Sequence, residues 1–399
     1  MRDPTRARLL HCATAPNMRV LLISTLLLTP AFTACTEDGF GEEGGADLAG
    51  QDDKGDAIPG IEVLARLEPG SVDTKLTTAV PRPGFVFYAA EGAKVNLEVT
   101  HAGSTTGLDT LLKVYGPRLA DGSYPKTLAT DEDAGYGKLS KIRDLTVSYG
   151  GFYLVEVSAG AASAPLTDAK ARLKLSCTGV CDTDAPVAPL GFDLRWYQRS
   201  AERRALTAQA YTLATAKVVA KVAAGAPANW GVVLDIDETT LNNSAYQRAR
   251  AELGLGYSPA SWTEWVNKKA ATPIDGALAF TSKVKQLGGK VVFVSNRMAA
   301  NECAQTEDNL AATGFVYDAI LCRTAASEKN TRFAAVQNGT AKPGLPALQV
   351  LAFVGDNIQD FPVLTQEVRT QPESAFSGFG DNLIILPNPM YGSWEKNAD

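Results

Sequence analysis

The second half of the chain contains five short apolar runs, separated by stretches with helical spacing. The runs are Gly231–Leu234, Val291–Val294, Ala319–Leu321, Val350–Val354 and Leu383–Leu386. Short apolar runs bounded by helical patterns are typical of strands buried on both faces of a parallel sheet. Ahead of them, Leu194–Val222 carries apolar residues at helical spacing and predicts one long amphipathic helix. Together these patterns predict a doubly wound, Rossmann-like α/β domain over residues 190–399.

The first half has a different pattern, in which apolar and polar residues alternate between turns rich in Gly, Asp and Pro. Runs of this kind include Gly84–Tyr88, Lys94–Val99, Leu111–Tyr115, Phe152–Val157 and Ala171–Leu175. Alternation with period two predicts strands, so we expect residues 59–180 to form an antiparallel, jelly-roll-like β-sandwich. Residues 36–58 are rich in Gly, Asp and Glu and predict a disordered tether.

The longest apolar run lies near the amino terminus, where Val20–Leu28 follows Met18 and one arginine. A basic start, a short apolar core and small residues predict a signal peptide over residues 1–35, with Met18 as the true start. The run is shorter than the about 20 residues of a membrane-spanning helix. Cys35 resembles the lipidated cysteine of bacterial lipoproteins, which predicts an exported, outer-membrane-anchored protein. Plain secretion after cleavage at Ala31 is the alternative.

Composition narrows the classes of function. The 399 residues exceed the about 100–200 residues of one domain, so two globular domains are expected. The net charge is −6 and no long basic run occurs, which excludes a nucleic-acid duplex as partner. The two histidines, His11 and His101, both lie in the first half. The α/β domain therefore has neither histidine-based phosphoryl transfer nor a histidine-ligated zinc site.

The cysteine count fits an oxidising compartment. The chain has six cysteines: Cys12, Cys35, Cys177, Cys181, Cys303 and Cys322. Without the two that belong to the signal segment, four remain, an even number. We expect the disulfides Cys177–Cys181 and Cys303–Cys322. The Cys-x3-Cys spacing also fits half of a metal site, but no second half accompanies it.

Candidate chemistry lies at the ends of the predicted parallel strands. Polar residues follow the five apolar runs: Asp235, Ser295, Arg323, Asp356 and Asn388. Ligands of open α/β sheets bind beyond the carboxyl ends of the strands. Asp235 and Asp237 are two residues apart, so both carboxylates face the same side of an extended segment. A cation between them relieves their repulsion, and Asp235, Asp356 and a backbone carbonyl together suit Mg²⁺.

Such a site indicates phosphoryl transfer to a carboxylate. Asp235 as nucleophile would form an acyl phosphate, which divides one difficult displacement into two easier ones. The phosphate oxygens need donors, and Ser295, Asn296 and Lys329 are the candidates. We therefore expect a small-molecule phosphate ester as substrate.

Several segments resemble a known family. Four of them resemble the four motifs of the haloacid dehalogenase (HAD) superfamily: Asp235–Thr239, Val294–Arg297, Lys329–Phe333 and Gly355–Phe361. Pro387–Glu395 and Trp196–Glu202 narrow the resemblance to the bacterial class C acid phosphatases, cell-surface lipoproteins of the 5′-nucleotidase type. The resemblance implies a HAD-type parallel sheet with a helical cap, and a Mg²⁺-dependent acid phosphatase.

The resemblance also implies a role for each motif residue. Asp235 would be the nucleophile and a metal ligand. Asp237 would bind the metal through its carbonyl and act as general acid. Asp356 would be the third protein ligand to the metal, and Asp360 would support it from behind. Ser295 and Lys329 would hold the phosphate.

Two aromatic residues predict the substrate class. Trp262 and Tyr391 match the pair with which the family sandwiches a nucleobase or aryl group, which implies nucleoside monophosphates and aryl phosphates as substrates. The alternative is that Trp262 and Trp265 only pack a helix onto the core. Two further alternatives concern the reaction: a phosphotransferase that uses the same intermediate, or a non-catalytic surface-binding lipoprotein.

The β-domain resembles the pre-peptidase C-terminal domain of secreted bacterial enzymes, through Leu108–Tyr115 and Gly151–Val157 and the acidic segment between them. Its ligand would be Ca²⁺, a glycan or a protein. Asp109, Asp131 and Asp133 offer oxygens for Ca²⁺. Because acidic residues are common in exposed turns, the favoured interpretation of these three is an ordinary turn.

Overall fold

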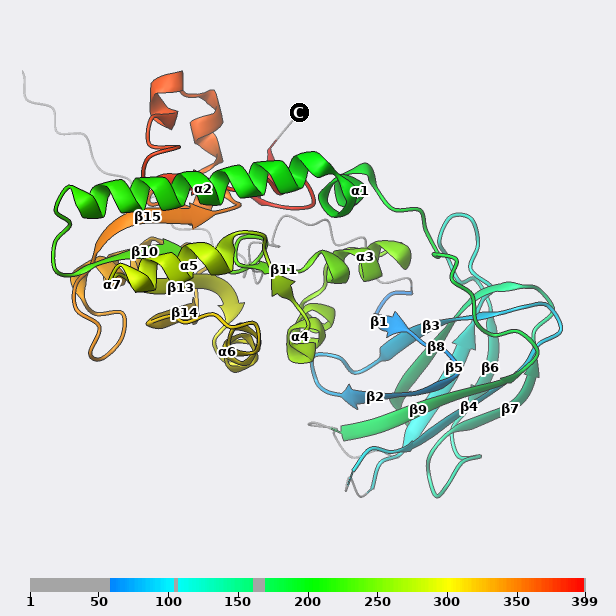
Figure 1. Cartoon of the computed structure of the whole chain (residues 1–399). Coiled ribbons are helices and arrows are strands. Elements are labelled where there is room, and N and C mark those ends of the chain that lie inside the picture. The colour runs from blue at the N-terminus through cyan, green and yellow to red at the C-terminus, as the bar shows by residue number, and fades with distance from the viewer. Residues whose placement is uncertain (1–57, 104–106, 161–168, 398–399) are drawn as a thin grey trace, which may run out of the picture. The chain divides into compact units, whose positions relative to one another are not determined.

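A computed structural model of the chain describes residues 58–103, 107–160 and 169–397 (Figure 1). The expected signal peptide, with Cys35, and all but the last residue of the expected tether lie outside the described residues. No helix within the described ranges is both long and apolar enough to span a membrane.

The described part of the first domain has nine strands in two sheets. They are β1 (Glu62–Arg66), β2 (Gly70–Leu76), β3 (Pro83–Ala89), β4 (Lys94–His101), β5 (Thr110–Tyr115), β6 (Thr127–Asp131), β7 (Lys141–Thr146), β8 (Gly151–Ala159) and β9 (Ala169–Thr178). The sheet orders are β1-β3-β8-β5-β6 and β2-β9-β4-β7. The predicted antiparallel β-region is confirmed, with one departure. Strand β1 pairs parallel with β3. The strand between them in the sequence, β2, belongs to the other sheet, so β1 and β3 are not joined as a hairpin.

Alternation along the strands builds the core of this domain. In β4, Val95, Leu97 and Val99 are fully buried, whereas the residues between them are partly exposed. The same period places Leu173 and Leu175 of β9 in that core. Because successive side chains of a strand point to opposite faces, one face of each sheet supplies the interior of the sandwich.

Glu156 of β8 is a buried charge in this domain, with only 1% of its side chain exposed. Its carboxylate accepts bonds from Arg82 Nε and Nη2 at 2.7 and 3.0 Å and from the Tyr115 hydroxyl at 2.6 Å. Burial by itself would raise the pKa of Glu156, but the hydrogen bonds from Arg82 and Tyr115 outweigh burial and hold this pKa below its ordinary value. The carboxylate is therefore ionised and paired in the folded state.

Replacing Glu156 with glutamine should lower the free energy of unfolding at neutral pH by about 1–3 kcal/mol, a range reduced because Arg82 is one-third exposed and screened. The depressed pKa sets the sign of the pH dependence. The stabilisation is present above the unfolded value of 4.5 and is lost as the pH falls through the lower folded value. Urea unfolding of both proteins between about pH 7 and about pH 3 measures it. A difference that does not shrink in acid would contradict a charge effect.

The second domain is built on a five-stranded parallel sheet. Its strands are β10 (Trp230–Leu234), β13 (Lys290–Met298), β14 (Ala319–Arg323), β15 (Gln349–Gly355) and β16 (Leu383–Ile385), in the order β14-β13-β10-β15-β16. All neighbouring pairs are parallel, so the five strands expected from the apolar runs are confirmed. The chain builds outward from β10 in one direction and then returns to β15 on its other side. The topological switch point, where such sheets bind ligands, lies between β10 and β15.

Helices cover both faces of this sheet. They are α2 (Ala201–Ala223), α5 (Ala277–Gln286), α6 (Cys303–Ala312) and α7 (Asn330–Asn338). The helix before them, α1 (Phe192–Arg199), packs in a separate cluster with residues such as Tyr246 and Trp262. Val232 and Leu234 pack in one cluster with residues of α2 and α5, whereas Val233 packs in another with residues of α7. Figure 1 shows α2 running along the sheet. Because successive residues of β10 pack against opposite faces of the sheet, the buried stretch of the strand is apolar at every position.

The single helix expected over Leu194–Val222 is two helices in the structure, and that prediction is wrong at one residue. Ser200 has an extended ψ of 141°, and its side-chain oxygen accepts a bond from the backbone N–H of Arg203. A serine in this position caps the helix that follows it. The local cap therefore interrupts a pattern that is periodic on both sides.

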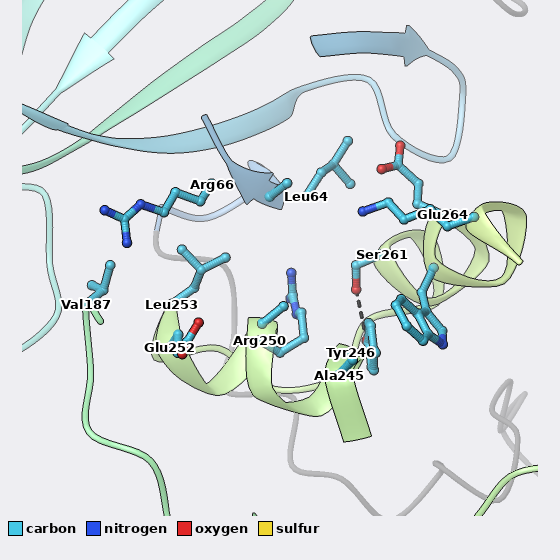
Figure 2. Close-up of a pocket in the computed structure, with 14 residues that line it drawn as sticks. Leu64, Arg66, Val187, Ala245, Tyr246, Arg250, Glu252, Leu253, Ser261 and Glu264 are labelled. Atoms are coloured by element: carbon cyan, nitrogen blue, oxygen red, sulfur yellow. Dashed lines mark hydrogen bonds between the residues drawn. The ribbon is translucent and has the colours of Figure 1, made fainter. Parts of the chain in front are cut away.

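The cap region lies between β10 and α5. It comprises α3 (Ser244–Glu252) and α4 (Pro259–Lys268), with the short paired strands β11 (Leu241–Asn242) and β12 (Thr272–Pro273). A cavity of about 170 Å³ lies beside α3 and α4 (Figure 2). Figure 2 shows Tyr246 and Ser261 on its wall, joined by a 3.0 Å hydrogen bond. The described residues that line this cavity include none of the predicted catalytic residues.

Short 3₁₀ helices complete the described chain after β15. They are η1 (Ile358–Asp360), η2 (Gln366–Thr370), η3 (Glu373–Phe376) and η4 (Ser393–Lys396). The first of them follows β15 almost directly and therefore lies at the switch point.

Candidate active site

Asp235 follows β10 directly and lies at the switch point of the sheet. Its backbone N–H donates to the carbonyl of Val354 in β15 at 3.0 Å, and its own carbonyl accepts from the Thr240 hydroxyl at 2.6 Å. The residue is therefore fixed between two strands and the turn that follows. Only 2% of Asp235 and 2% of Asp237 is exposed, so both carboxyl groups are buried despite their charge.

A buried lysine joins two of the predicted carboxylates. Lys329 Nζ lies 2.5 Å from Asp235 Oδ1 and 2.6 Å from Asp360 Oδ1, and each of the three side chains is 1% exposed. Lys329 immediately precedes α7, which positions it at this edge of the sheet. Because burial removes the water that would otherwise screen these charges, the attraction between them is strong.

Asp356 is held by neighbours on several sides. Its Oδ1 accepts from the Thr239 hydroxyl at 2.8 Å and its Oδ2 accepts from Asn388 Nδ2 at 2.9 Å. Asp360 Oδ2 accepts from the backbone N–H groups of Asp356 and Asn357 at 3.1 and 2.9 Å. These bonds fix both the side chain and the backbone of Asp356, as partners behind a metal ligand do.

The acidic residues fit a divalent cation. Asp235, Asp356 and Asp360 each present a carboxylate oxygen, and these oxygens lie within 4.8 Å of one another. An all-oxygen donor set that carries several negative charges suits a hard cation. Two of the three predicted ligands, Asp235 and Asp356, therefore lie together, and Asp360 accepts bonds from a lysine and from backbone N–H groups beside them.

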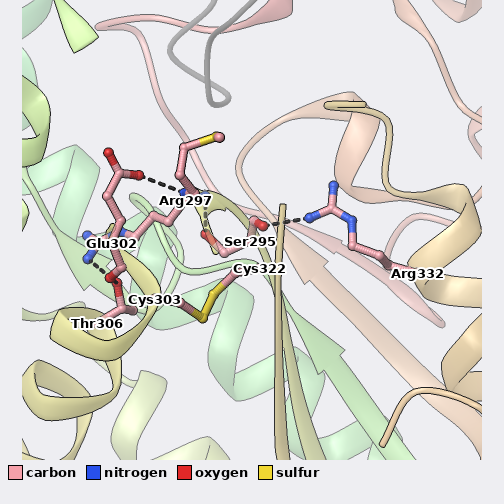
Figure 3. The surroundings of a disulfide bond; sticks show 8 residues. Ser295, Arg297, Glu302, Cys303, Thr306, Cys322 and Arg332 are labelled. Atoms are coloured by element: carbon pink, nitrogen blue, oxygen red, sulfur yellow. Dashed lines mark hydrogen bonds between the residues drawn. A yellow bond between two sulfur atoms is a disulfide. The ribbon is translucent and has the colours of Figure 1, made fainter. Parts of the chain in front are cut away.

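The predicted phosphate-binding residues Ser295 and Asn296 lie near the carboxyl end of β13. Ser295 is fully buried, and its hydroxyl accepts from the backbone N–H of Arg297 at 3.1 Å. Arg332 of α7 donates to the carbonyl of Ser295 and to Asn296 Oδ1, both at 2.5 Å. Figure 3 shows Arg332 reaching Ser295 from the neighbouring helix. The strand end is thus tied to the helix that positions Lys329.

Both predicted disulfides are present. Cys177 bonds Cys181 in the first domain, and Cys303 bonds Cys322 in the second. Figure 3 shows the second disulfide close to Ser295. It joins the first residue of α6 to β14, the strand next to β13, and so links the elements on either side of the predicted phosphate-binding segment.

Two residues at this site were not predicted. Arg297 donates from Nε and Nη2 to Asp237 Oδ1 at 3.0 and 2.7 Å, and Asn243 Nδ2 donates to the same oxygen at 2.9 Å. Arg297 is the last residue of the motif-like segment Val294–Arg297, but nothing in the sequence indicated which group its side chain would bind. Asn243 gave no signal, because its contact depends on how the turn after β10 folds back.

Glu238 is a further buried carboxyl in the turn after β10. Its φ is +55°, an unusual value for a residue with a side chain. It accepts a bond from the backbone N–H of Asn243 at 2.6 Å and another from the Tyr391 hydroxyl. Burial, and then the nearby charges of Asp237 and Asp356, raise the pKa of Glu238 well above its ordinary value.

The predicted aromatic pair lies in one buried cluster. Trp262 and Tyr391 are both 1% exposed. The Trp262 ring meets Tyr246 edge-on at 5.1 Å between centroids, and the guanidinium carbon of Arg297 lies 5.3 Å from its ring centre. The structure therefore brings the pair into one cluster, and their stacking on a substrate remains a prediction.

Two of the three acidic residues considered for Ca²⁺ in the first domain have other partners. Asp131 Oδ2 accepts from the backbone N–H groups of Ala134 and Lys141 at 3.1 and 2.7 Å. Asp109 lies 3.7 Å from Lys138. These contacts are those of residues that stabilise turns, and the ligand of this domain stays a prediction.

Comparison with known proteins gives a family and two similar solved structures for the second domain. Residues 182–394 match the family described as HAD superfamily, subfamily IIIB (Acid phosphatase). The class C acid phosphatase from Bacillus anthracis is 31% identical over 51% of this chain and 84% of that chain, with a TM-score of 0.46. A second structure of the class C acid phosphatase from Bacillus anthracis, with tungstate bound, is 29% identical over 52% and 90% of the two chains, also with a TM-score of 0.46.

The pre-peptidase C-terminal domain of a collagenase from Bacillus anthracis matches 29% of this chain and 95% of its own length, at 14% identity and a TM-score of 0.22. That similarity is too low to identify the first domain. The family match, in contrast, covers more than half of the chain and includes every residue of the buried carboxylate site. The chain therefore belongs to the subfamily IIIB acid phosphatases of the HAD superfamily and is a phosphomonoester hydrolase.

Proposed function

We propose that this chain is an exported, Mg²⁺-dependent acid phosphatase that hydrolyses phosphate monoesters through an aspartyl-phosphate on Asp235. The observation that carries the proposal is the position of Asp235. Its carboxylate lies at the switch point of the sheet, 2.5 Å from Lys329 Nζ and grouped with the carboxylates of Asp356 and Asp360. The proposed nucleophile, the lysine proposed to bind the phosphate and the carboxylates proposed to hold the metal therefore lie next to one another.

In the first step, a carboxylate oxygen of Asp235 attacks the phosphorus atom and the ester P–O bond breaks. Asp237 gives its proton to the departing oxygen, so the alcohol leaves neutral. Lys329 Nζ and the Ser295 hydroxyl donate to the phosphoryl oxygens and stabilise their charge. The phosphoryl group is then covalently bound to Asp235.

In the second step, a water molecule attacks the phosphorus atom and gives a proton to the carboxylate of Asp237. The bond between phosphorus and Asp235 breaks, which releases inorganic phosphate and restores both carboxyl groups. Asp235, Asp356 and the carbonyl of Asp237 would hold Mg²⁺, which when bound neutralises charge on the phosphoryl oxygens. The Asp360 carboxylate accepts a hydrogen bond from the backbone N–H of Asp356 and so keeps Asp356 in place.

For the substrate class, we propose nucleoside monophosphates and aryl phosphates. The support is the cluster that contains Trp262 and Tyr391, because Arg297 lies over the Trp262 ring and also bonds Asp237, the proposed acid. Stacking on a flat ring tolerates many aromatic groups. An alcohol acceptor in place of water would make the enzyme a phosphotransferase, and the ratio of free phosphate to released alcohol in excess acceptor separates the two reactions.

Export is part of the proposal, with Cys35 as the site of a lipid anchor. Its support is the short apolar run and the small residues that precede this cysteine. Fractionation of cells that express the full chain tests the location. Phosphatase activity in the cytoplasmic fraction alone would contradict export.

Removing the metal should lower the rate of phosphate release by about 10³-fold or more, because charge neutralisation by a metal contributes several kcal/mol to the transition state. The measurement is release of inorganic phosphate from an aryl phosphate and from a nucleoside monophosphate. It is made before chelation, after chelation and after adding Mg²⁺ back. Circular dichroism shows whether the chelated protein stays folded. Full activity without any divalent metal would contradict the proposal.

A further inference from the structure

Arg297 is a buried charged residue that bonds the turn after β10 and helix α6. Its side chain is 1% exposed. Nε and Nη2 donate to Asp237 Oδ1, Nη1 donates to the Thr306 hydroxyl at 3.0 Å, and Nη2 also donates to Asn243 Oδ1 at 3.1 Å. The planar guanidinium is thus fixed in one orientation by partners from the turn after β10 and from α6.

Asn243 is fixed equally well. Its Oδ1 accepts from Arg297 Nη2 and from Trp265 Nε1, the latter at 2.9 Å. Arginine and tryptophan side chains only donate, so the atom that faces both of them must be the amide oxygen. The amide nitrogen therefore points the other way, where it donates to Asp237 Oδ1 at 2.9 Å.

The consequence is an asymmetry between the two oxygens of Asp237. Three N–H bonds, two from Arg297 and one from Asn243, end on Oδ1. An oxygen that accepts three N–H groups has no lone pair left to carry a proton. When Asp237 is the acid, its proton must therefore be on Oδ2, and the same three bonds set the direction in which Oδ2 points.

The energetics favour a role in catalysis over one in stability. A buried ion pair contributes little net stability compared with a well-packed apolar pair, because both charges lose their hydration. Arg297 and Asp237 are 1% and 2% exposed, so this cost applies in full. What the pair provides is a defined orientation of one carboxyl group, which is what general acid catalysis requires.

We propose that Arg297 and Asn243 are positioning residues that hold Asp237 by Oδ1, so that Oδ2 delivers the proton to the leaving oxygen. The inference rests on the proposed function, in which Asp237 is the general acid. It assigns Arg297 to the acid and not to the phosphate. The two assignments predict different dependence on the leaving group.

The test compares phenyl phosphate with 4-nitrophenyl phosphate in the Arg297→Met variant. The two substrates share one ring, so stacking is matched, but only phenol is a poor leaving group that needs a proton from Asp237. We expect kcat/KM to fall about 10²-fold for phenyl phosphate but only about tenfold for 4-nitrophenyl phosphate. The ratio of the two values does not depend on how much of the sample is folded.

Three further variants sharpen this test. Asp237→Asn removes the acid itself, and adding Arg297→Met to it should change the ratio no further, because the two substitutions remove one function. Asn243→Ala removes one of the three bonds and should change the ratio in the same direction by a smaller factor. Arg248→Met, at an exposed arginine of α3 that pairs with Glu252, should leave the ratio unchanged.

Equal losses on both substrates in Arg297→Met would overturn the inference, since a residue that binds phosphate or only supports the fold lowers both values alike. So would a further change of the ratio in the double variant. Failure of the proposed function looks different. In that case the unmodified protein itself would release no phosphate from either substrate in the presence of Mg²⁺.

Discussion

Replacing Asp235 with asparagine is expected to lower kcat/KM for an aryl phosphate by about 10⁴-fold or more, as loss of a covalent nucleophile does in other enzymes. An amide oxygen is neutral and does not form a stable bond to phosphorus. The charge partner of Lys329 is also lost, so the lysine is left with one carboxylate fewer at 2.5 Å. Since Asp235 is only 2% exposed, water has little space to replace the carboxylate.

The matched control is Asp308→Asn, at an exposed aspartate of α6 that pairs with Lys269. It makes the same chemical change outside the site and should retain activity. Phosphate release measures both variants, and the mass of the intact protein shows that the asparagine has not reverted to aspartate. Substantial turnover by a folded, unreverted Asp235→Asn protein would exclude the aspartyl-phosphate mechanism.

The strands of the first domain that the sequence revealed are those with a neighbouring strand on each side. In the first domain the alternating runs became β3, β4, β5, β8 and β9, which lie inside the two sheets. The strands without a clear pattern, β1, β2, β6 and β7, are the four sheet edges. An edge strand has one neighbour and buries less, as the mostly exposed or intermediate residues of β6 show. Its sequence is therefore less constrained to alternate.

The candidate catalytic positions could be predicted from the sequence for a geometric reason. The carboxyl ends of parallel strands share one edge, so residues such as Asp235 and Asp356 must approach each other once their strands are recognised. Arg297 and Asn243 escaped because their importance lies in contacts made by side chains across two elements. No spacing along the chain encodes such contacts, and a packed structure is needed to find them.

Replacing Lys329 with methionine is expected to lower the free energy of unfolding by about 3–5 kcal/mol in the presence of chelator, the usual cost of removing one partner from a buried ion pair. The reason is that Lys329 lies between Asp235 and Asp360, at 2.5 and 2.6 Å, with all three side chains 1% exposed. Without the lysine, two buried carboxylates face each other. Urea unfolding with chelator measures the difference.

The same variant should lose about 10²–10³-fold in kcat/KM, because one preorganised donor to the phosphoryl oxygens is removed. Mg²⁺ binds only the folded site, so saturating metal should recover part of the lost stability. It should recover little of the activity, since a metal ion on the carboxylates does not replace a donor to the phosphate. Lys342→Met, at an exposed lysine that bonds the carbonyl of Asp318, is the matched control and should change neither quantity. If Mg²⁺ restored activity as fully as stability, Lys329 would act only as a counter-charge for its two aspartates and not as a phosphate ligand.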